Sequence, residues 1–146
     1  MRPLPHGPPG RRPGPRRPDT PRDRQPVIHL AKWTKLEANP ELSDQLRDRI
    51  NTELDVYVSA VSVWELSIKK AAGMINFPEN LLDRLDRGGL SELPIRRAHG
   101  DLAGRLPMIH RDPFDRMLVA QAMAERLTLV TRDRFIQKYD VQVLEA

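Results

Sequence analysis

The sequence predicts an α/β fold with a short, mostly parallel sheet. Segments that read as strands alternate along the chain with segments of helical periodicity. Residues 127–133 form a short, nearly continuous apolar run, which is typical of a parallel strand buried on both faces. Strands that alternate with helices indicate a parallel sheet covered by helices. With 146 residues, the chain is long enough for one such domain and too short for two ordinary ones.

The first half of the globular part holds four predicted elements. Residues 43–52 open on a serine and space Leu and Ile four apart, which predicts a helix. Residues 55–61 alternate and are rich in valine, which predicts a strand. We expect a helix over 62–74 that stops near a glycine. A shorter helix is expected over 78–89, because this segment begins with proline and ends with paired glycines.

The second half continues the alternation and contains the clearest helix. Residues 112–127 begin with Asp, Pro, Phe and Asp, which combine a capping residue with a proline in the first turn. The predicted elements around it are a strand at 93–95, a helix at 97–106, a strand at 127–133, a helical turn at 134–139 and a final strand at 141–145.

Residues 1–26 differ from the rest in composition. They hold nine of the 14 prolines, and seven arginines against two aspartates, a balance of +5. The other 120 residues hold 17 basic and 18 acidic side chains, a balance of −1. A segment with so little to bury does not offset its chain entropy, so we predict a disordered tail before one domain at 27–146. The tail is either a basic arm that contacts phosphates or a passive segment, such as one from a wrong start or reading frame in GC-rich DNA.

Missing motifs narrow the function. Cysteine is absent, which excludes thiolate nucleophiles and Cys-ligated metals, and we expect a cytoplasmic protein. No apolar run is long enough for a membrane span, and residues 1–26 lack the apolar core of a secretory signal. There is no Gly-rich phosphate loop, no GxSxG and no HExxH, and the four histidines lack metal-ligand spacing. The chemistry is therefore expected from carboxylates at the ends of elements.

Glu65 is the first of these carboxylates. It follows the strand predicted at 55–61, and Ser62 stands three residues before it. This spacing fits a capping box, with Ser62 as the cap. The alternative is that Glu65 points into a cleft beyond the carboxyl end of the strand, where open α/β sheets bind ligands.

Two further carboxylates are expected at the same edge of the sheet. In the stretch HRDPFDRM, Asp112 suits the helix cap, which leaves Asp115 for another role. Asp133 ends the segment 127–133, just past the carboxyl end of its buried strand, either as a turn residue or as part of a site. Carboxylates that meet repel one another unless a cation lies between them. Mg²⁺ or Mn²⁺ is the natural occupant of such an oxygen-rich site.

Three segments of the chain carry a family resemblance: SAVSVWELSIKKAAGMINFPENL (59–81), HRDPFDRMLVAQAMAERLTLVTRD (110–133) and YDVQVL (139–144). Together they resemble the PIN-domain ribonucleases and, more narrowly, the VapC-type toxins of bacterial type II toxin–antitoxin systems. The resemblance covers about residues 27–146. It implies a three-layer α/β/α domain, an acidic cluster that binds Mg²⁺ or Mn²⁺, and cleavage of an RNA substrate. It further implies a cognate antitoxin and a homodimer as partners.

The resemblance also implies roles for individual residues. By matching position, the catalytic and metal-binding acids are Glu65, Asp115 and Asp133. Asp112 is an extra acid of this subgroup that joins the metal ligands or caps the helix. The neighbouring side chains that we consider for contact with the RNA backbone, or for a solvated surface role, are His110, Arg111 and Arg116.

The chain departs from the family pattern near its N-terminus. Such proteins usually begin with a hydrophobic strand that ends in DTH, whose Asp is the first metal ligand. The corresponding stretch here is VIHLAKW (27–33), which puts Val27 at the Asp position and Ile28 at the Thr position. Because the preceding residues are polar, we predict that the first strand is lost and that nuclease activity is weak or absent. Val27→Asp alone is then expected to restore little.

Two other classes of function stay open. The chain could be an inactive PIN-like module that binds an antitoxin or RNA without cutting. It could also be a DNA-binding regulator that uses the basic arm, although we find no helix-turn-helix with a basic recognition helix. The apolar faces of the helices predicted at 43–52 and 78–87 would serve a homodimer, an antitoxin or simply the core.

Overall fold

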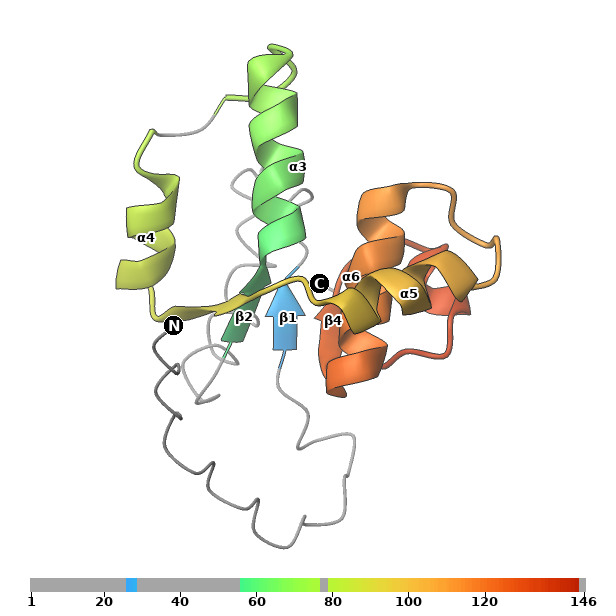
Figure 1. Cartoon of the computed structure of the whole chain (residues 1–146). Coiled ribbons are helices and arrows are strands. Elements are labelled where there is room, and N and C mark those ends of the chain that lie inside the picture. The colour runs from blue at the N-terminus through green and yellow to red at the C-terminus, as the bar shows by residue number, and fades with distance from the viewer. Residues whose placement is uncertain (1–25, 29–55, 77–78, 145–146) are drawn as a thin grey trace, which may run out of the picture.

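The computed structural model describes residues 26–28, 56–76 and 79–144, which form a parallel sheet with helices on both sides (Figure 1). All strand pairs in this part of the chain are parallel, and the strand order is β3-β2-β1-β4-β5. The predicted α/β class with a short parallel sheet is confirmed. The strands are β1 (Pro26–Ile28), β2 (Val56–Ser59), β3 (Leu90–Leu93), β4 (Thr128–Val130) and β5 (Val143–Leu144).

The helices lie in two groups on the two faces of the sheet, which gives the three-layer arrangement. In Figure 1, α5 and α6 lie together at one side of the strands, and α3 and α4 lie away from them. Among the described residues, no helix is long and apolar enough to cross a membrane. The helices are α3 (Ala60–Ala71), α4 (Leu81–Arg87), α5 (Arg97–Arg105), α6 (Pro113–Glu125) and the 3₁₀ turn η2 (Ile136–Lys138).

The two faces of the sheet are covered by separate apolar clusters. Neighbouring residues of a strand point to opposite faces, and β1 shows this clearly. Val27 belongs to the larger cluster, with Leu118 and Val119 of α6. Ile28 belongs to the smaller one, with Leu66 of α3. The central strand is therefore buried on both sides, as expected for a parallel sheet between helix layers.

The prediction that the first strand is lost is wrong. Residues Pro26–Ile28 form β1 in the middle of the sheet, paired with β2 on one side and β4 on the other. Three residues suffice because β4 is equally short, and a proline is tolerated at the first position of a strand. Val27 points into the α5 and α6 core, so an aspartate there would place a carboxylate among apolar side chains. Pro26, assigned to the tail by composition, belongs to the domain.

Most other predicted elements are confirmed with shifted ends. The strand predicted at 55–61 ends at Ser59, because Ser59 already caps α3: its Oγ accepts a hydrogen bond from the Val61 N–H at 3.1 Å. The strand predicted at 93–95 lies earlier, at Leu90–Leu93, paired with β2. The helix predicted at 43–52 lies outside the described residues, as does the rest of the tail.

Candidate metal centre

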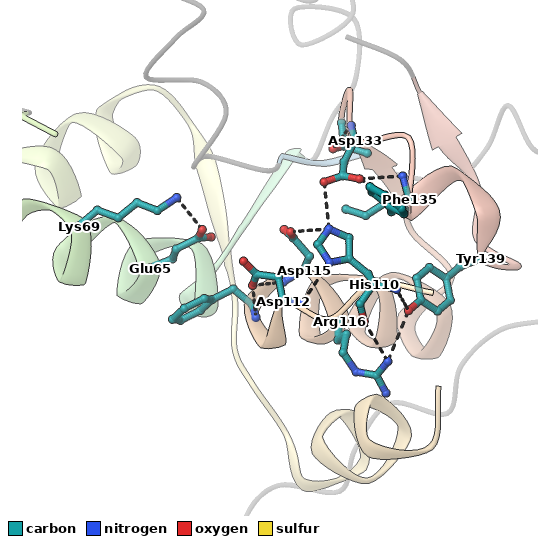
Figure 2. Close-up of polar contacts among 12 residues, drawn as sticks. Glu65, Lys69, His110, Asp112, Asp115, Arg116, Asp133, Phe135 and Tyr139 are labelled. Carbon is teal, nitrogen blue, oxygen red and sulfur yellow. Dashed lines mark hydrogen bonds and ion pairs between the residues drawn. The ribbon is translucent and has the colours of Figure 1, made fainter. Parts of the chain in front are cut away.

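Three side chains meet at the carboxyl edge of the sheet: His110 and Asp115 flank the start of α6, and Asp133 follows β4. The His110 Nε2 lies 2.9 Å from Asp115 Oδ2 and 3.0 Å from Asp133 Oδ2 (Figure 2). The side chains are mostly buried, with exposed fractions of 14%, 9% and 11% for His110, Asp115 and Asp133. One potential ligand atom from each residue lies within 4.8 Å of the other two. The sequence prediction that Asp115 and Asp133 approach each other at one edge is thus met.

Asp112 and Asp115 divide their roles as their positions in α6 require. Asp112 is the cap: its Oδ1 accepts hydrogen bonds from the N–H groups of Phe114 and Asp115, at 2.8 and 3.3 Å. Pro113 occupies the first helical position, where a missing N–H does no harm. Asp115 is buried in the first turn and points to His110. Asp112 is not in the group with Asp115 and Asp133, so its carboxylate serves the helix.

Asp133 combines both roles that the sequence left open. Its Oδ1 accepts from the N–H groups of Phe135 and Ile136, at 2.8 and 3.3 Å, and so holds the turn that leads into η2. Its Oδ2 is directed to His110. Its own N–H donates to Thr131 Oγ1, at 3.1 Å, which fixes the backbone directly after β4. The turn therefore sets the carboxylate in place, and one oxygen faces the site.

His110 presents an N–H, and not a lone pair, to the two carboxylates. Its Nδ1 lies 3.1 Å from the backbone N of Asp112, and a backbone N–H can only donate. Nδ1 is therefore the acceptor, which leaves the proton of the neutral ring on Nε2. The same Nε2 lies within hydrogen-bond distance of both Asp115 and Asp133. The imidazole thus links the two acids and offsets part of their mutual repulsion.

A second set of contacts fixes the loop that carries His110. The Tyr139 hydroxyl accepts from the His110 N–H and donates to the Pro107 carbonyl, both at 2.8 Å. Arg116 Nη2 donates to the carbonyls of Ala103 and Leu106 at the end of α5, at 2.8 and 2.9 Å. Arg116 Nη1 donates to the carbonyls of Pro107 and His110. The Arg116 guanidinium is therefore occupied by the loop between α5 and α6 and does not face outward to a phosphate.

Glu65 lies apart from this group. It belongs to the second turn of α3, since the helix is capped by Ser59, so the capping box with Ser62 is wrong. Ser62 is a buried residue inside the helix. Glu65 is itself buried, and its Oε1 accepts from Lys69 Nζ at 2.8 Å. Figure 2 shows this pair on α3, to one side of Asp112 and Asp115.

The donor set fits a divalent cation only in part. Asp115 and Asp133 offer carboxylate oxygens, which Mg²⁺ and Mn²⁺ prefer. Both oxygens lie close enough together to share one ion. The third member of the group offers an N–H in its present tautomer, and β1 provides no acid among its three residues. The site can therefore hold a cation through two acids, and Glu65 of α3 is not a member of the group.

Comparisons with known proteins bear on the fold and the family of the chain. A search of curated proteins gave no match. The chain is similar to several solved structures, all under 25% identical. VapBC2 from Rickettsia felis, bound to a DNA fragment from its promoter, is 15% identical with a TM-score of 0.61, over 82% of this chain and 96% of that one. FitAcB from Neisseria gonorrhoeae is 19% identical with a TM-score of 0.57, over 83% and 97%.

A toxin–antitoxin complex from Klebsiella pneumoniae gives similar values, with 14% identity, a TM-score of 0.60, and coverage of 83% and 97%. At such low identity, these likenesses establish the fold. The sequence comparison establishes the family, because the PIN-domain model matches residues 31–142, which is well over half of the chain and includes Asp115 and Asp133. The chain belongs to the PIN-domain family.

Proposed function

We propose that this chain is a metal-dependent endoribonuclease of the VapC toxin type, which hydrolyses RNA phosphodiester bonds with weak activity. The observation that carries the proposal is the approach of Asp115 and Asp133, two buried acids from α6 and the end of β4, to one point at the carboxyl edge of the sheet. Membership of the PIN-domain family, which is generally a nuclease family, supports the reaction class.

Asp115 and Asp133 would hold the cation, Mg²⁺ or Mn²⁺, and Glu65 would be the third catalytic acid. When bound, the cation supplies an activated water and stabilises charge on the phosphate oxygens. The protein holds Asp115 by the first turn of α6 and Asp133 by the hydrogen bonds of η2. Glu65 requires release from Lys69 to turn toward them, because its Oε1 is bound to that ammonium group.

Basic side chains near the acids would contact the RNA backbone. Arg111 precedes the cap of α6 and is exposed, and Arg134 is exposed next to Asp133. Contacts of this kind position a nucleic acid without reading its sequence. Arg116 drops out of this set, because it holds the loop before α6.

Weak activity follows from β1. The strand has the family's central position but carries Pro, Val and Ile, so it adds no carboxylate to the site. A cation held by fewer acids binds less tightly and is less well placed. Weak activity is therefore expected because β1 lacks the acid, and not because the strand itself is lost.

A cognate antitoxin and a second copy of this chain are the proposed protein partners. Several similar structures are toxin–antitoxin complexes, and some of them contain DNA. The side of the fold with α3 and α4 presents an apolar groove lined by Val63, Leu82 and Leu85, and Leu82 is strongly exposed. Such a surface suits an apolar segment of a partner protein.

The second candidate function is binding without catalysis: the chain would be an inactive PIN-like module that binds an antitoxin or RNA without cutting. It is favoured by the hydrogen bonds of His110 to both acids, which already link them without a metal. The two functions differ in a direct measurement, because only the nuclease requires the cation.

The test is cleavage of a labelled RNA pool by the purified chain with Mg²⁺, Mn²⁺ or EDTA. We expect slow cleavage with Mn²⁺ or Mg²⁺, none with EDTA, and loss of cleavage in both Asp115→Asn and Glu65→Gln. Asp101→Asn is the matched control, since Asp101 is an exposed acid on α5 that pairs with Arg105 and is not in the group with Asp115 and Asp133. Cleavage that persists in EDTA, or in Asp115→Asn, would exclude this mechanism. No cleavage in any condition, with RNA binding intact, would favour the inactive module.

A further inference from the structure

His110 is the member of the group His110, Asp115 and Asp133 that is not a carboxylate. We infer that His110 competes with the divalent cation: its Nε2–H occupies the oxygens of Asp115 and Asp133, and the cation binds there only when the imidazole withdraws. The inference rests on the proposed function, because it assumes that these two acids are cation ligands.

The hydrogen-bond pattern of the ring carries the argument. An imidazole nitrogen ligates a metal through its lone pair. On His110 the nitrogen that carries the lone pair is Nδ1. That lone pair already accepts a hydrogen bond from the Asp112 N–H, at 3.1 Å. The nitrogen that faces the acids therefore carries a proton. For Nε2 to become a ligand, the proton would have to move to Nδ1 and the bond to Asp112 would have to break.

The surroundings allow the ring to leave while the backbone stays. The His110 N–H and carbonyl are held by Tyr139 and Arg116. Among the described residues, the ring makes polar contacts at its two nitrogens and an edge contact with Phe135, which is itself exposed. A side-chain rotation would therefore remove Nε2 from the acids and release the Asp112 N–H from Nδ1, while the backbone contacts of His110 and the Asp112 side-chain cap of α6 stay in place.

The charges of Asp115 and Asp133 decide whether removal of the His110 ring strengthens or weakens cation binding. The neutral ring donates to both acids, so it lowers their mutual repulsion and their attraction for a cation. Without the ring, two mostly buried carboxylates would face each other with no hydrogen-bond donor from residue 110. A cation would then bind without first breaking the hydrogen bonds to charged oxygens. Removal of the imidazole is expected to strengthen cation binding, whereas removal of a ligand would weaken it.

The test is the dissociation constant for Mn²⁺, measured by electron paramagnetic resonance of free Mn²⁺, for the full chain and its variants. We expect His110→Ala to bind Mn²⁺ about tenfold more tightly than the wild type, since the competing state loses the Nε2–H donor that the two charged oxygens share. His99→Ala is the matched control. Its ring has the same pattern of contacts with a different carboxylate, that of Glu125, so its Mn²⁺ affinity should stay at the wild-type value.

The outcomes separate the inference from the proposed function. Weaker Mn²⁺ binding in His110→Ala would make His110 a ligand and would overturn the inference alone. An unchanged affinity would overturn it as well. No Mn²⁺ binding in either protein would overturn the inference together with the proposed function. Binding in His110→Ala but not in the wild type would support the inference in its strongest form.

A second measurement on the unmodified chain removes any doubt from misfolding of the variant. Long-range ¹H–¹⁵N spectra distinguish the two neutral tautomers of a histidine. We expect His110 to show the Nε2–H tautomer and to keep it when Mg²⁺ is added, with a shift of its Nε2 proton as the bonds to the acids are lost. An Nδ1–H tautomer, before or after addition of Mg²⁺, would overturn the inference.

Discussion

Two histidines of this fold use the same hydrogen bonds in different surroundings. The Nδ1 of His99 accepts from the Arg96 N–H, and that of His110 accepts from the Asp112 N–H. The Nε2 of each ring then faces carboxylate oxygen. His99 is 1% exposed and meets a single acid, Glu125, whose side chain is 37% exposed. His110 meets two acids that are both mostly buried.

The difference shows how one local arrangement serves structure in one place and chemistry in another. At His99 the carboxylate is about one-third in solvent, so little charge is buried, and the ring joins α5 to the end of α6. At His110 two charges are held near each other away from water, which requires a hydrogen-bond donor or a cation. The number and burial of the acids distinguish the two sites, since the histidine contacts alone are the same.

The largest expected effect on stability is at His99. His99→Ala should lower the free energy of unfolding by about 3 kcal/mol, because it leaves a cavity and removes both hydrogen bonds of a fully buried ring. Urea unfolding followed by circular dichroism measures this value. A loss no larger than that of His110→Ala would contradict the assignment of His99 to structure.

A smaller effect is expected at His110, and it should depend on metal. His110→Ala should lower the free energy of unfolding by about 1 kcal/mol without a divalent ion, since the ring is partly exposed and leaves two acids to repel each other. Mn²⁺ binds the folded state, so the same unfolding experiment in excess Mn²⁺ should cancel the loss. His99→Ala should show no such rescue beyond that of the wild type.

Tyr139→Phe should affect the surroundings of His110 and leave those of His99 unchanged. The hydroxyl joins the His110 N–H to the Pro107 carbonyl, and its removal should cost about 1 kcal/mol of stability. The chemical shift of the His110 amide should move strongly in ¹H–¹⁵N spectra, while that of His99 stays in place. Equal shifts at both residues would mean that the two loops are not independent.

The cap of α6 gives a further contrast between a structural acid and a site acid. Asp112→Asn should change stability by only a few tenths of a kcal/mol, because Asn is about as good a helix cap as Asp. Its Mn²⁺ affinity should remain at the wild-type value, since the Asp112 carboxylate serves backbone N–H groups. A large loss of Mn²⁺ affinity in Asp112→Asn would make this residue a ligand.

The smallest effect is expected at Glu125. Glu125→Gln keeps an oxygen that accepts from His99 and changes only the charge of a group that is partly in solvent. The free energy of unfolding should therefore change by less than about 0.5 kcal/mol. A larger loss would show that charge matters at His99 as it does at His110.

The sequence was sufficient for the parts of the fold that depend on local signals. Asp112 and Pro113 are typical residues for the start of a helix, so the start of α6 was predicted near its observed place. The strand that leads to Asp133 is an apolar run, so it too was predicted near its observed place. The paired glycines after α4 were also predicted as its end. These features depend on neighbouring residues only.

The parts that were missed depend on partners far along the chain. β1 is stable because two other strands pair with it, which its own three residues do not reveal. The cap of α3 went to Ser59, and not to Ser62, because Ser59 also reaches Gln121 of α6. His110 looked like a surface residue because its acid Asp133 is 23 positions away. The signal that could have identified it was its place two residues before Asp112, the cap of α6.

The most direct test of a metal centre at Asp115 and Asp133 is Mn²⁺ binding to the wild type and to Asp133→Asn. Electron paramagnetic resonance of free Mn²⁺ gives the number of sites and the dissociation constant of each protein. Asn can still accept from the N–H groups of Phe135 and Ile136, so the turn that leads into η2 should stay in place while one charge is lost. We expect one Mn²⁺ site in the wild type, and an affinity at least about tenfold lower in the variant, the loss of one charge-assisted ligand. An equal affinity in the two proteins would contradict a metal centre formed by Asp115 and Asp133.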